Sequence, residues 1–245
     1  MQARYNSRHR HIFKGIFLTA ITALTLMSAQ TQAQDSGLPG TFSGEVTFTT
    51  DYIFRGFTQT DGDPAVEGGF AWESDGGFYV GTWASNVDFN DGDEASIEID
   101  LYGGYAGEID NFSYDVGLVY YWYPGAAGTL NYDFWEAYGS VGYDFGAASV
   151  SFGIAYTPEN FGDTDDGIYY QSGVSVPVTD RFSIDANLNY YDVDPAFGQD
   201  YLDWNIGATL SLEWFDADLR YFDADISACT NVCDSRVVFS STRSF

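Results

Sequence analysis

From Phe42 to Phe245 this chain repeats one pattern about twelve times. Segments of roughly ten residues alternate apolar and polar side chains, and Gly, Asp, Asn or Pro stands near the end of each. Residues 112–120, FSYDVGLVY, place Phe, Tyr, Val, Leu and Tyr at every second position. Because successive side chains of a strand point to opposite faces of a sheet, each segment predicts a strand with one apolar and one polar face.

The first residues have the pattern of an export signal. A basic stretch precedes an apolar run over residues 16–27, and small residues follow at Thr31-Gln32-Ala33. The run is short for a membrane-spanning helix. We therefore expect residues 1–33 to be a cleaved signal peptide and residues 34–245 to form the mature domain. The basic residues of the signal are Arg4, Arg8, Arg10 and Lys14.

Export and the final Phe245 bear on the choice between two folds that share this alternation. A soluble β-sandwich also pairs an apolar face with a polar one. An exported chain of alternating strands with a terminal Phe is typical of barrels in the outer membrane, which are apolar outside and polar inside. We predict an all-β fold, an antiparallel transmembrane β-barrel of about 12 strands in the cell outer membrane, with the soluble sandwich as the alternative.

Tight turns and longer polar loops alternate along the chain, which is a further mark of such barrels. An even number of strands would place both ends of the barrel domain on the side of the short turns. The strands are expected near residues 42–55, 64–73, 77–86, 95–107, 111–123, 132–145, 147–157, 167–177, 181–191, 201–212, 214–223 and 236–245. In the first strand, Phe42, Val46, Phe48 and Tyr52 would face outward. Aromatic pairs such as Tyr190-Tyr191 would form girdles at the membrane interfaces.

The charge of the mature chain excludes one class of partner. The full chain has 9 basic and 36 acidic residues, and four basic ones belong to the signal, so the mature charge is 5 − 36 = −31. Nucleic acid is not expected as a partner, because phosphate binding needs a basic surface. Adaptation of the whole proteome to salt would also produce such acidity.

The mature chain contains no histidine, because His9 and His11 both lie in the signal. Catalytic pairs of a serine or cysteine nucleophile with a histidine are therefore ruled out, and so are metal sites with histidine ligands. We expect neither an enzyme nor a cofactor or metal centre.

The inward faces of the strands are the candidate site. Gly and Ser are frequent there, which favours open space, and an excess of carboxylates would attract cations. The alternative is a filled barrel in which these carboxylates pair with Arg, Tyr or Asn. The predicted lumen-facing residues are Glu45, Arg55, Glu67, Glu98, Asp100, Asp115, Glu136, Asp144, Asp185, Asp203, Asp216, Asp218 and Arg220.

Two features of the loops have ordinary explanations. Acidic stretches such as Asp61-Gly62-Asp63 could bind calcium, but they lack a complete EF-hand spacing, and Asp and Gly are common turn formers. Cys229 and Cys233 are the only cysteines. In an exported protein such a pair predicts a small disulfide rather than a metal site.

Several stretches resemble the TorF-type porin family of Gram-negative outer membranes. They include Thr50-Asp51-Tyr52-Ile53-Phe54-Arg55-Gly56, Gly77-Phe78-Tyr79 with Gly81-Thr82-Trp83-Ala84-Ser85-Asn86-Val87, Glu98-Ile99-Asp100-Leu101-Tyr102-Gly103-Gly104-Tyr105, and the ending from Arg236 to Phe245. The resemblance extends over essentially the whole mature chain and implies an outer-membrane barrel. Arg243 departs from the apolar or aromatic residue usual in a closing strand.

These observations predict a porin-like passive channel for small hydrophilic solutes, with a preference for cations. A non-conducting barrel with a structural or surface-binding role is the alternative. The expected partners are outer-membrane lipid and lipopolysaccharide, small solutes or cations, and the barrel-assembly machinery, which would recognise Phe245. The sequence leaves homo-oligomerisation open.

Overall fold

The structure is a computed structural model that describes residues 40–245 except 91, 93–94, 194–198 and 228. The predicted signal peptide, residues 1–33, lies outside the described residues. None of the described residues belongs to a helix long and apolar enough to cross a membrane.

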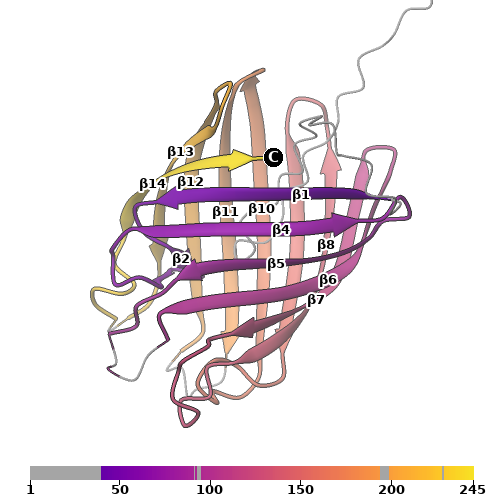
Figure 1. The fold of residues 1–245 in the computed structure, drawn as a ribbon. Helices are drawn as coiled ribbons and strands as arrows, with labels where there is room; N and C mark the ends of the chain where they lie inside the picture. Colours follow the sequence, from indigo (N-terminus) through magenta and orange to yellow (C-terminus); the bar gives the residue numbers. More distant parts are fainter. Residues whose placement is uncertain (1–39, 91, 93–94, 194–198, 228) are drawn as a thin grey trace, which may run out of the picture.

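Twelve antiparallel strands form one closed barrel, which confirms the predicted fold class (Figure 1). Each strand pairs with its neighbours in the chain, and β1 pairs with β14 to close the sheet. The barrel strands are β1 (Thr41–Thr49), β4 (Ala65–Glu73), β5 (Phe78–Asn86), β6 (Ile97–Ile109), β7 (Phe112–Trp122), β8 (Phe134–Asp144), β9 (Ser149–Thr157), β10 (Gly167–Thr179), β11 (Phe182–Val193), β12 (Tyr201–Ser211), β13 (Asp216–Ala224) and β14 (Arg236–Ser244).

The connections are short at one end of the barrel and long at the other, as predicted. We call the end that carries residues 74–77, 110–111, 145–148, 180–181 and 212–215 the turn side. The opposite end, the loop side, carries the described residues 50–64, 87–90, 92, 95–96, 123–133, 158–166, 199–200, 225–227 and 229–235. β1 begins and β14 ends on the turn side.

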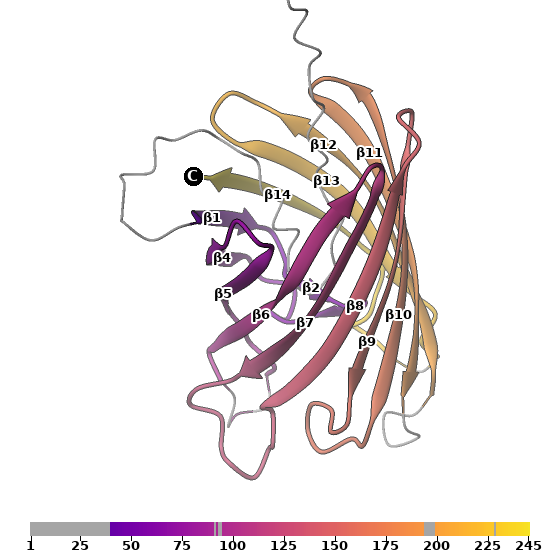
Figure 2. The same ribbon diagram turned by 90° about the vertical axis from the view of Figure 1, so that its right-hand side faces the viewer.

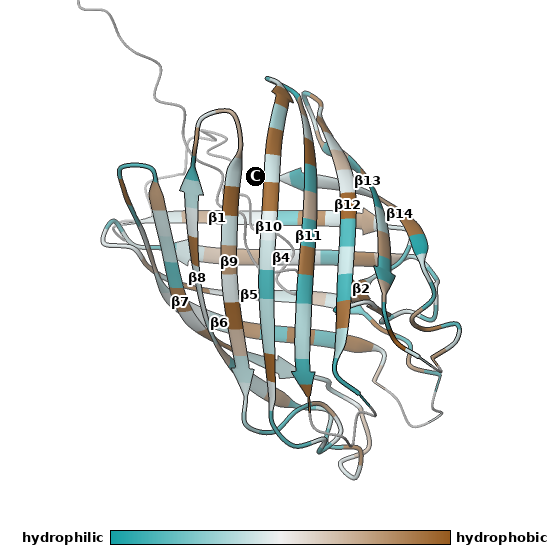
Figure 3. Cartoon of the chain, turned by 180° about the vertical axis from the view of Figure 1, so that it is seen from behind, coloured by the Kyte–Doolittle hydropathy of each residue, from teal (hydrophilic) through white to brown (hydrophobic). Residues whose placement is uncertain are grey.

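Hydrophilic and hydrophobic residues alternate along the strands (Figure 3), and large apolar side chains are exposed on the outward faces, as the alternation predicts. Phe48, Phe152 and Leu188 are all more than half exposed. In β5, whose two faces look equally apolar in the sequence, Phe78 is exposed outside and Trp83 is buried inside. Such a surface is stable only in a hydrocarbon environment, and a closed sheet leaves no unpaired strand edge within it.

The last residue closes the barrel together with β1. Gly44 and Phe245 exchange two backbone hydrogen bonds, each 2.9 Å long. Nearby, Arg243 donates a hydrogen bond to the carbonyl of Trp214 at 2.8 Å, and its guanidinium lies 5.6 Å from the centre of that ring. The unusual arginine of the closing strand is therefore held against the turn between β12 and β13.

The first predicted strand, residues 42–55, is too long. β1 ends at Thr49, and the chain then forms a short separate hairpin from β2 (Ile53–Phe54) and β3 (Phe57–Thr58). Tyr52, predicted to face outward, is buried instead. The alternation continues past Thr49 because the hairpin is also extended chain, so periodicity alone does not reveal the bend.

The turn between β4 and β5 supplies a test of the fold. Gly77 has φ of +88°, and a Cβ there would lie 2.3 Å from the carbonyl oxygen of Ala106. A Cβ on the adjacent Gly76 would meet only a side-chain atom of Ser74, at 3.9 Å. We expect Gly77→Ala to lower the free energy of unfolding by about 1–3 kcal/mol. Gly76→Ala should change it by less than about 0.5 kcal/mol. Urea unfolding in lipid vesicles measures both, and equal effects would contradict this register.

Candidate functional site

The two halves of the lumen differ in how far their side chains are buried. On the loop side the inward residues are buried, among them Glu136, Tyr138, Tyr169, Tyr191 and Tyr201. Farther along the same strands, toward the turn side, the inward residues are small or polar and remain partly exposed. They include Ser140, Gly142, Ser151, Gly153, Gly173, Ser175, Asn187, Thr209, Ser211, Ser240 and Thr242. The barrel is therefore filled on the loop side, whereas these inward residues of the turn side keep partial exposure.

The filling comes largely from segment 50–64, which includes the β2–β3 hairpin. Its residues contact strands around most of the barrel: Tyr52 packs against Trp83 of β5, Arg55 pairs with Glu136 of β8, and Arg236 of β14 binds Asp51. A segment that touches strands on opposite walls must cross the lumen. Figure 2 shows β2 between these walls.

The tip of the hairpin carries a buried arginine. Arg55 is 2% exposed, and its Nη2 atom donates a hydrogen bond to Oε2 of Glu136 at 2.7 Å. Its guanidinium carbon lies 4.7, 4.3 and 4.7 Å from the ring centres of Phe54, Tyr169 and Tyr191. We call Tyr169, Tyr191 and Glu136 the cation cage. Burial alone would lower the pKa of Arg55, but Glu136 together with the phenol groups of Tyr191, Tyr121 and Tyr169 outweighs it and raises that pKa above its ordinary value.

A second anchor holds the base of segment 50–64. Asp51 accepts hydrogen bonds from Thr58 at 2.5 Å, from Thr60 at 3.0 Å and from Nη1 of Arg236 at 2.6 Å. The same Arg236 donates to the carbonyl of Asn231 in the last loop. Asp51 and Arg236 thus join the first and last loops at the barrel seam.

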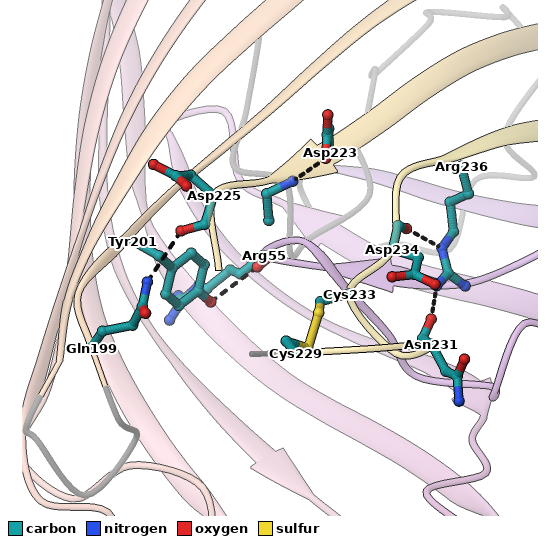
Figure 4. Close-up of a disulfide and its surroundings, with 11 residues drawn as sticks. Arg55, Gln199, Tyr201, Asp223, Asp225, Cys229, Asn231, Cys233, Asp234 and Arg236 are labelled. Atoms are coloured by element: carbon teal, nitrogen blue, oxygen red, sulfur yellow. Dashed lines mark hydrogen bonds between the residues drawn. A yellow bond between two sulfur atoms is a disulfide. The ribbon is translucent and has the colours of Figure 1, made fainter. Parts of the chain in front are cut away.

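The last loop packs against the hairpin as well (Figure 4). Cys229 and Cys233 form a disulfide there. The backbone N–H of Thr58 donates to the carbonyl of Val232 at 2.8 Å, and the hydroxyl of Tyr201 donates to the carbonyl of Arg55 at 3.0 Å. The disulfide loop is therefore part of the loop-side closure.

Carboxylates gather on one wall of the lumen. We call the six that lie on β1, β4, β6, β7 and β8 the acidic wall: Glu45, Glu67, Glu98, Asp100, Asp115 and Glu136. All six are buried. Strand register aligns Glu67 with Ser85, and Ser85 with Glu98, so these carboxylates are close neighbours across β5.

Few positive charges oppose the acidic wall. Arg55 reaches Glu136, while phenol groups hydrogen-bond two others: Tyr52 donates to Glu98 at 3.0 Å and Tyr79 to Asp115 at 2.7 Å. Burial and then the charges of Glu98 and Asp100 raise the pKa of Tyr52 well above its ordinary value, so it remains a donor. Within the described part of the chain, neither carboxylate oxygen of Asp100 has a hydrogen-bond partner.

The remaining predicted lumen residues lie elsewhere. Asp203 accepts hydrogen bonds from Tyr169 and Asn189 on the loop side. Asp218, Asp185 and Asn205 surround Arg220 on the opposite wall, at 3.1, 3.5 and 2.8 Å. Asp216 lies at the turn-side start of β13. Asp144 accepts a hydrogen bond from the N–H of Gly146, so it stabilises the β8–β9 turn.

No three His, Cys, Asp or Glu side chains converge on a metal-binding geometry in the described residues. Among the described residues, the acidic wall is therefore a row of buried carboxyl groups and not a three-ligand cluster.

Sequence reasoning missed the aromatic part of the site. Tyr169, Tyr191 and Tyr201 were expected in membrane girdles or not singled out, yet they are at most 3% exposed inside the barrel. The two-residue period of the strand could have revealed these inward tyrosines, because only one member of the pair Tyr190-Tyr191 can face lipid. Tyr190 is the outward one, and it is 38% exposed.

Known proteins share the fold. A model of a family described as a bacterial protein of unknown function (Gcw_chp) matches residues 32–245. The KdgM porin superposes with a TM-score of 0.59 at 9% identity, covering 83% of this chain and 99% of its own. The same porin in complex with disordered oligogalacturonate gives 0.58, also at 9% identity and with the same coverage. A COG4313 outer membrane channel from Pseudomonas putida F1 gives 0.48 at 9% identity, covering 85% and 96%. A comparison with curated protein sequences finds no match.

The Arg55–Glu136 pair predicts a large effect on stability. Glu136→Gln leaves a buried guanidinium without its counter-charge, which we expect to lower the free energy of unfolding by about 3 kcal/mol. Asp185→Asn is the matched control, because its partly exposed pair with Arg220 at 3.5 Å should be worth less than about 1 kcal/mol. Urea unfolding in lipid vesicles compares the two variants. Equal losses would contradict the role given to the buried pair.

Proposed function

This chain belongs to the Gcw_chp family of bacterial proteins of unknown function, and we propose that it is a porin-like passive channel for small hydrophilic solutes. The observation that carries the proposal is the partly exposed, Gly- and Ser-rich lumen of the turn-side half. The inward side chains named above for that half, from Ser140 to Thr242, are small or polar. Solutes would diffuse through this polar space and meet their narrowest passage at segment 50–64.

We further propose that the channel prefers cations. The acidic wall lies along the lumen, and Arg55 is the basic residue that pairs with it. Carboxylates in a confined, low-dielectric space raise the local concentration of cations and repel anions. Selectivity would then depend on the field of Glu98 and Asp100 and on the width left beside segment 50–64.

The proposed location is the cell outer membrane. The closed barrel with its apolar outer surface supports this location, and so does the fold shared with the KdgM porin. Outer-membrane lipid and lipopolysaccharide would then surround the barrel. The barrel-assembly machinery would recognise the closing strand with Phe245.

One observation favours a second candidate, a non-conducting barrel with a structural or surface-binding role. Segment 50–64 fills the loop-side half through two ion pairs and a set of aromatic contacts. If this segment never moves, the lumen is a pocket open only on the turn side. Conductance separates the two candidates.

Planar bilayers test the channel and its selectivity. We expect the protein to conduct and to favour potassium over chloride, most strongly at 0.1 M salt, where the Debye length is about 10 Å rather than the ~3 Å at 1 M. Replacing Glu98 by Gln together with Asp100 by Asn should lower the potassium-to-chloride permeability ratio by roughly two- to five-fold, since a unit charge at close range is worth about 1 kcal/mol in water.

Asp75→Asn with Glu108→Gln is the matched control, because it removes two exposed carboxylates near the turns. This control should retain the permeability ratio of the natural protein. Folded protein that never conducts would refute the channel and favour the structural role. Equal losses of selectivity in both double variants would refute the role of the acidic wall.

A further inference from the structure

Arg55 is held as a bound ligand would be held. Its guanidinium lies against the rings of Tyr169 and Tyr191 on the paired strands β10 and β11, with Phe54 of its own hairpin beside it, and pairs with a buried carboxylate. We propose that the cation cage of Tyr169, Tyr191 and Glu136 is a binding site for small organic cations of the guanidinium class, which Arg55 occupies as an internal surrogate. This inference deepens the proposed function and rests on it, since it names a solute class that the channel would admit.

The chemistry of the cage fits a flat, delocalised cation. The face of an aromatic ring attracts a cation within about 6 Å of its centre, and Tyr169 and Tyr191 both lie well inside that distance from the guanidinium. A guanidinium stacks on such faces and can bind both oxygens of a carboxylate at once. A compact ammonium has no flat face to stack.

The carboxylate retains capacity that Arg55 does not use. Oε2 of Glu136 accepts hydrogen bonds from Arg55 at 2.7 Å and from Tyr121 at 2.9 Å. Oε1 of Glu136 is buried, and no described residue is its hydrogen-bond partner. A free guanidinium, which no backbone tethers, could approach both oxygens. The site is therefore better matched to an untethered ligand than to its present occupant.

The backbone conformation at the hairpin tip does not favour arginine, which indicates that position 55 holds arginine because of the contacts of its side chain. Arg55 and Gly56 have φ of 49° and 86°, the left-handed pair of a two-residue hairpin turn. Asn or Asp with Gly is preferred at such a turn, and other residues cost roughly 1–2 kcal/mol in this conformation. Arginine is a poor choice for the turn itself, whereas its guanidinium fits the cage.

The cage lies near the loop-side end of the barrel, where the hairpin covers it. Tyr169 is near the loop-side start of β10 and Tyr191 near the loop-side end of β11. Figure 4 shows the tip of the hairpin between Tyr201 and the disulfide loop. Withdrawal of the hairpin would expose the cage to the loop side, and a guanidinium ligand would compete with Arg55 for it.

Calorimetry on the purified, folded barrel tests this site without any need for conductance. The probe is methylguanidinium at millimolar concentration, and N-methylurea, which is similar in shape but neutral, is the ligand control. We expect Arg55→Ala to bind methylguanidinium at least about ten-fold more tightly than the natural protein, because its cage is vacant. Adding Glu136→Gln to Arg55→Ala should reverse that gain.

Arg220→Ala is the matched protein control, because Asp218, Asp185 and Asn205 hold that arginine by hydrogen bonds and ion pairs. It should gain no such binding. If Arg55→Ala does not fold, Arg55→Lys replaces it, and methylguanidinium should still bind more tightly than to the natural protein. The site is refuted if neither Arg55 variant gains binding over the natural protein, or if N-methylurea binds as well. Binding without conductance would refute the channel alone, and conductance without binding would refute the site alone.

Discussion

The ion pair between Arg55 and Glu136 determines the character of the lumen, because it holds segment 50–64 across the barrel. Both groups are nearly without solvent exposure, so the removal of either leaves an uncompensated charge in a poorly solvated place. The aromatic rings around Arg55 reduce that cost by supplying an electron-rich surface. From this single contact follow the filled loop side, the buried phenol groups and the difference between the two halves.

The two halves also explain why one barrel can carry such an excess of acid. On the turn side, Asp185 and Asp218 are partly exposed, and solvent screens their charges. On the acidic wall, Glu98 and Asp115 accept hydrogen bonds from tyrosines, which donate to a carboxylate without adding charge. Each phenol therefore satisfies a carboxyl group without the added positive charge that an arginine in its place would bring. This arrangement connects the aromatic composition of the chain to its proposed preference for cations.

Much of the architecture could be predicted from the sequence, because a strand in a membrane barrel must alternate. Outward residues such as Phe152 and Leu188 follow from period two, and the closed barrel follows once the predicted export signal, the final Phe245 and the alternation of short turns and long loops are added. The hairpin did not follow, since Tyr52 and Phe54 continue the alternation although they belong to a segment that bends inward. Nor did the cation cage, because its members are far apart in the sequence and only the closed sheet brings β8, β10 and β11 around Arg55.

Thiol labelling inside the lumen tests the central claim most directly, that a polar path past segment 50–64 admits cations. Ser175 faces the partly exposed turn-side lumen, and the two native cysteines are joined, so Ser175→Cys would carry the free thiol to be labelled. Applied from the loop side of intact cells, a cationic methanethiosulfonate should label that cysteine at least about ten times faster than an anionic one of similar size. The account would be contradicted if both reagents labelled the cysteine only after the membrane was broken, so that they could enter from the turn side. The barrel would then be closed on the loop side.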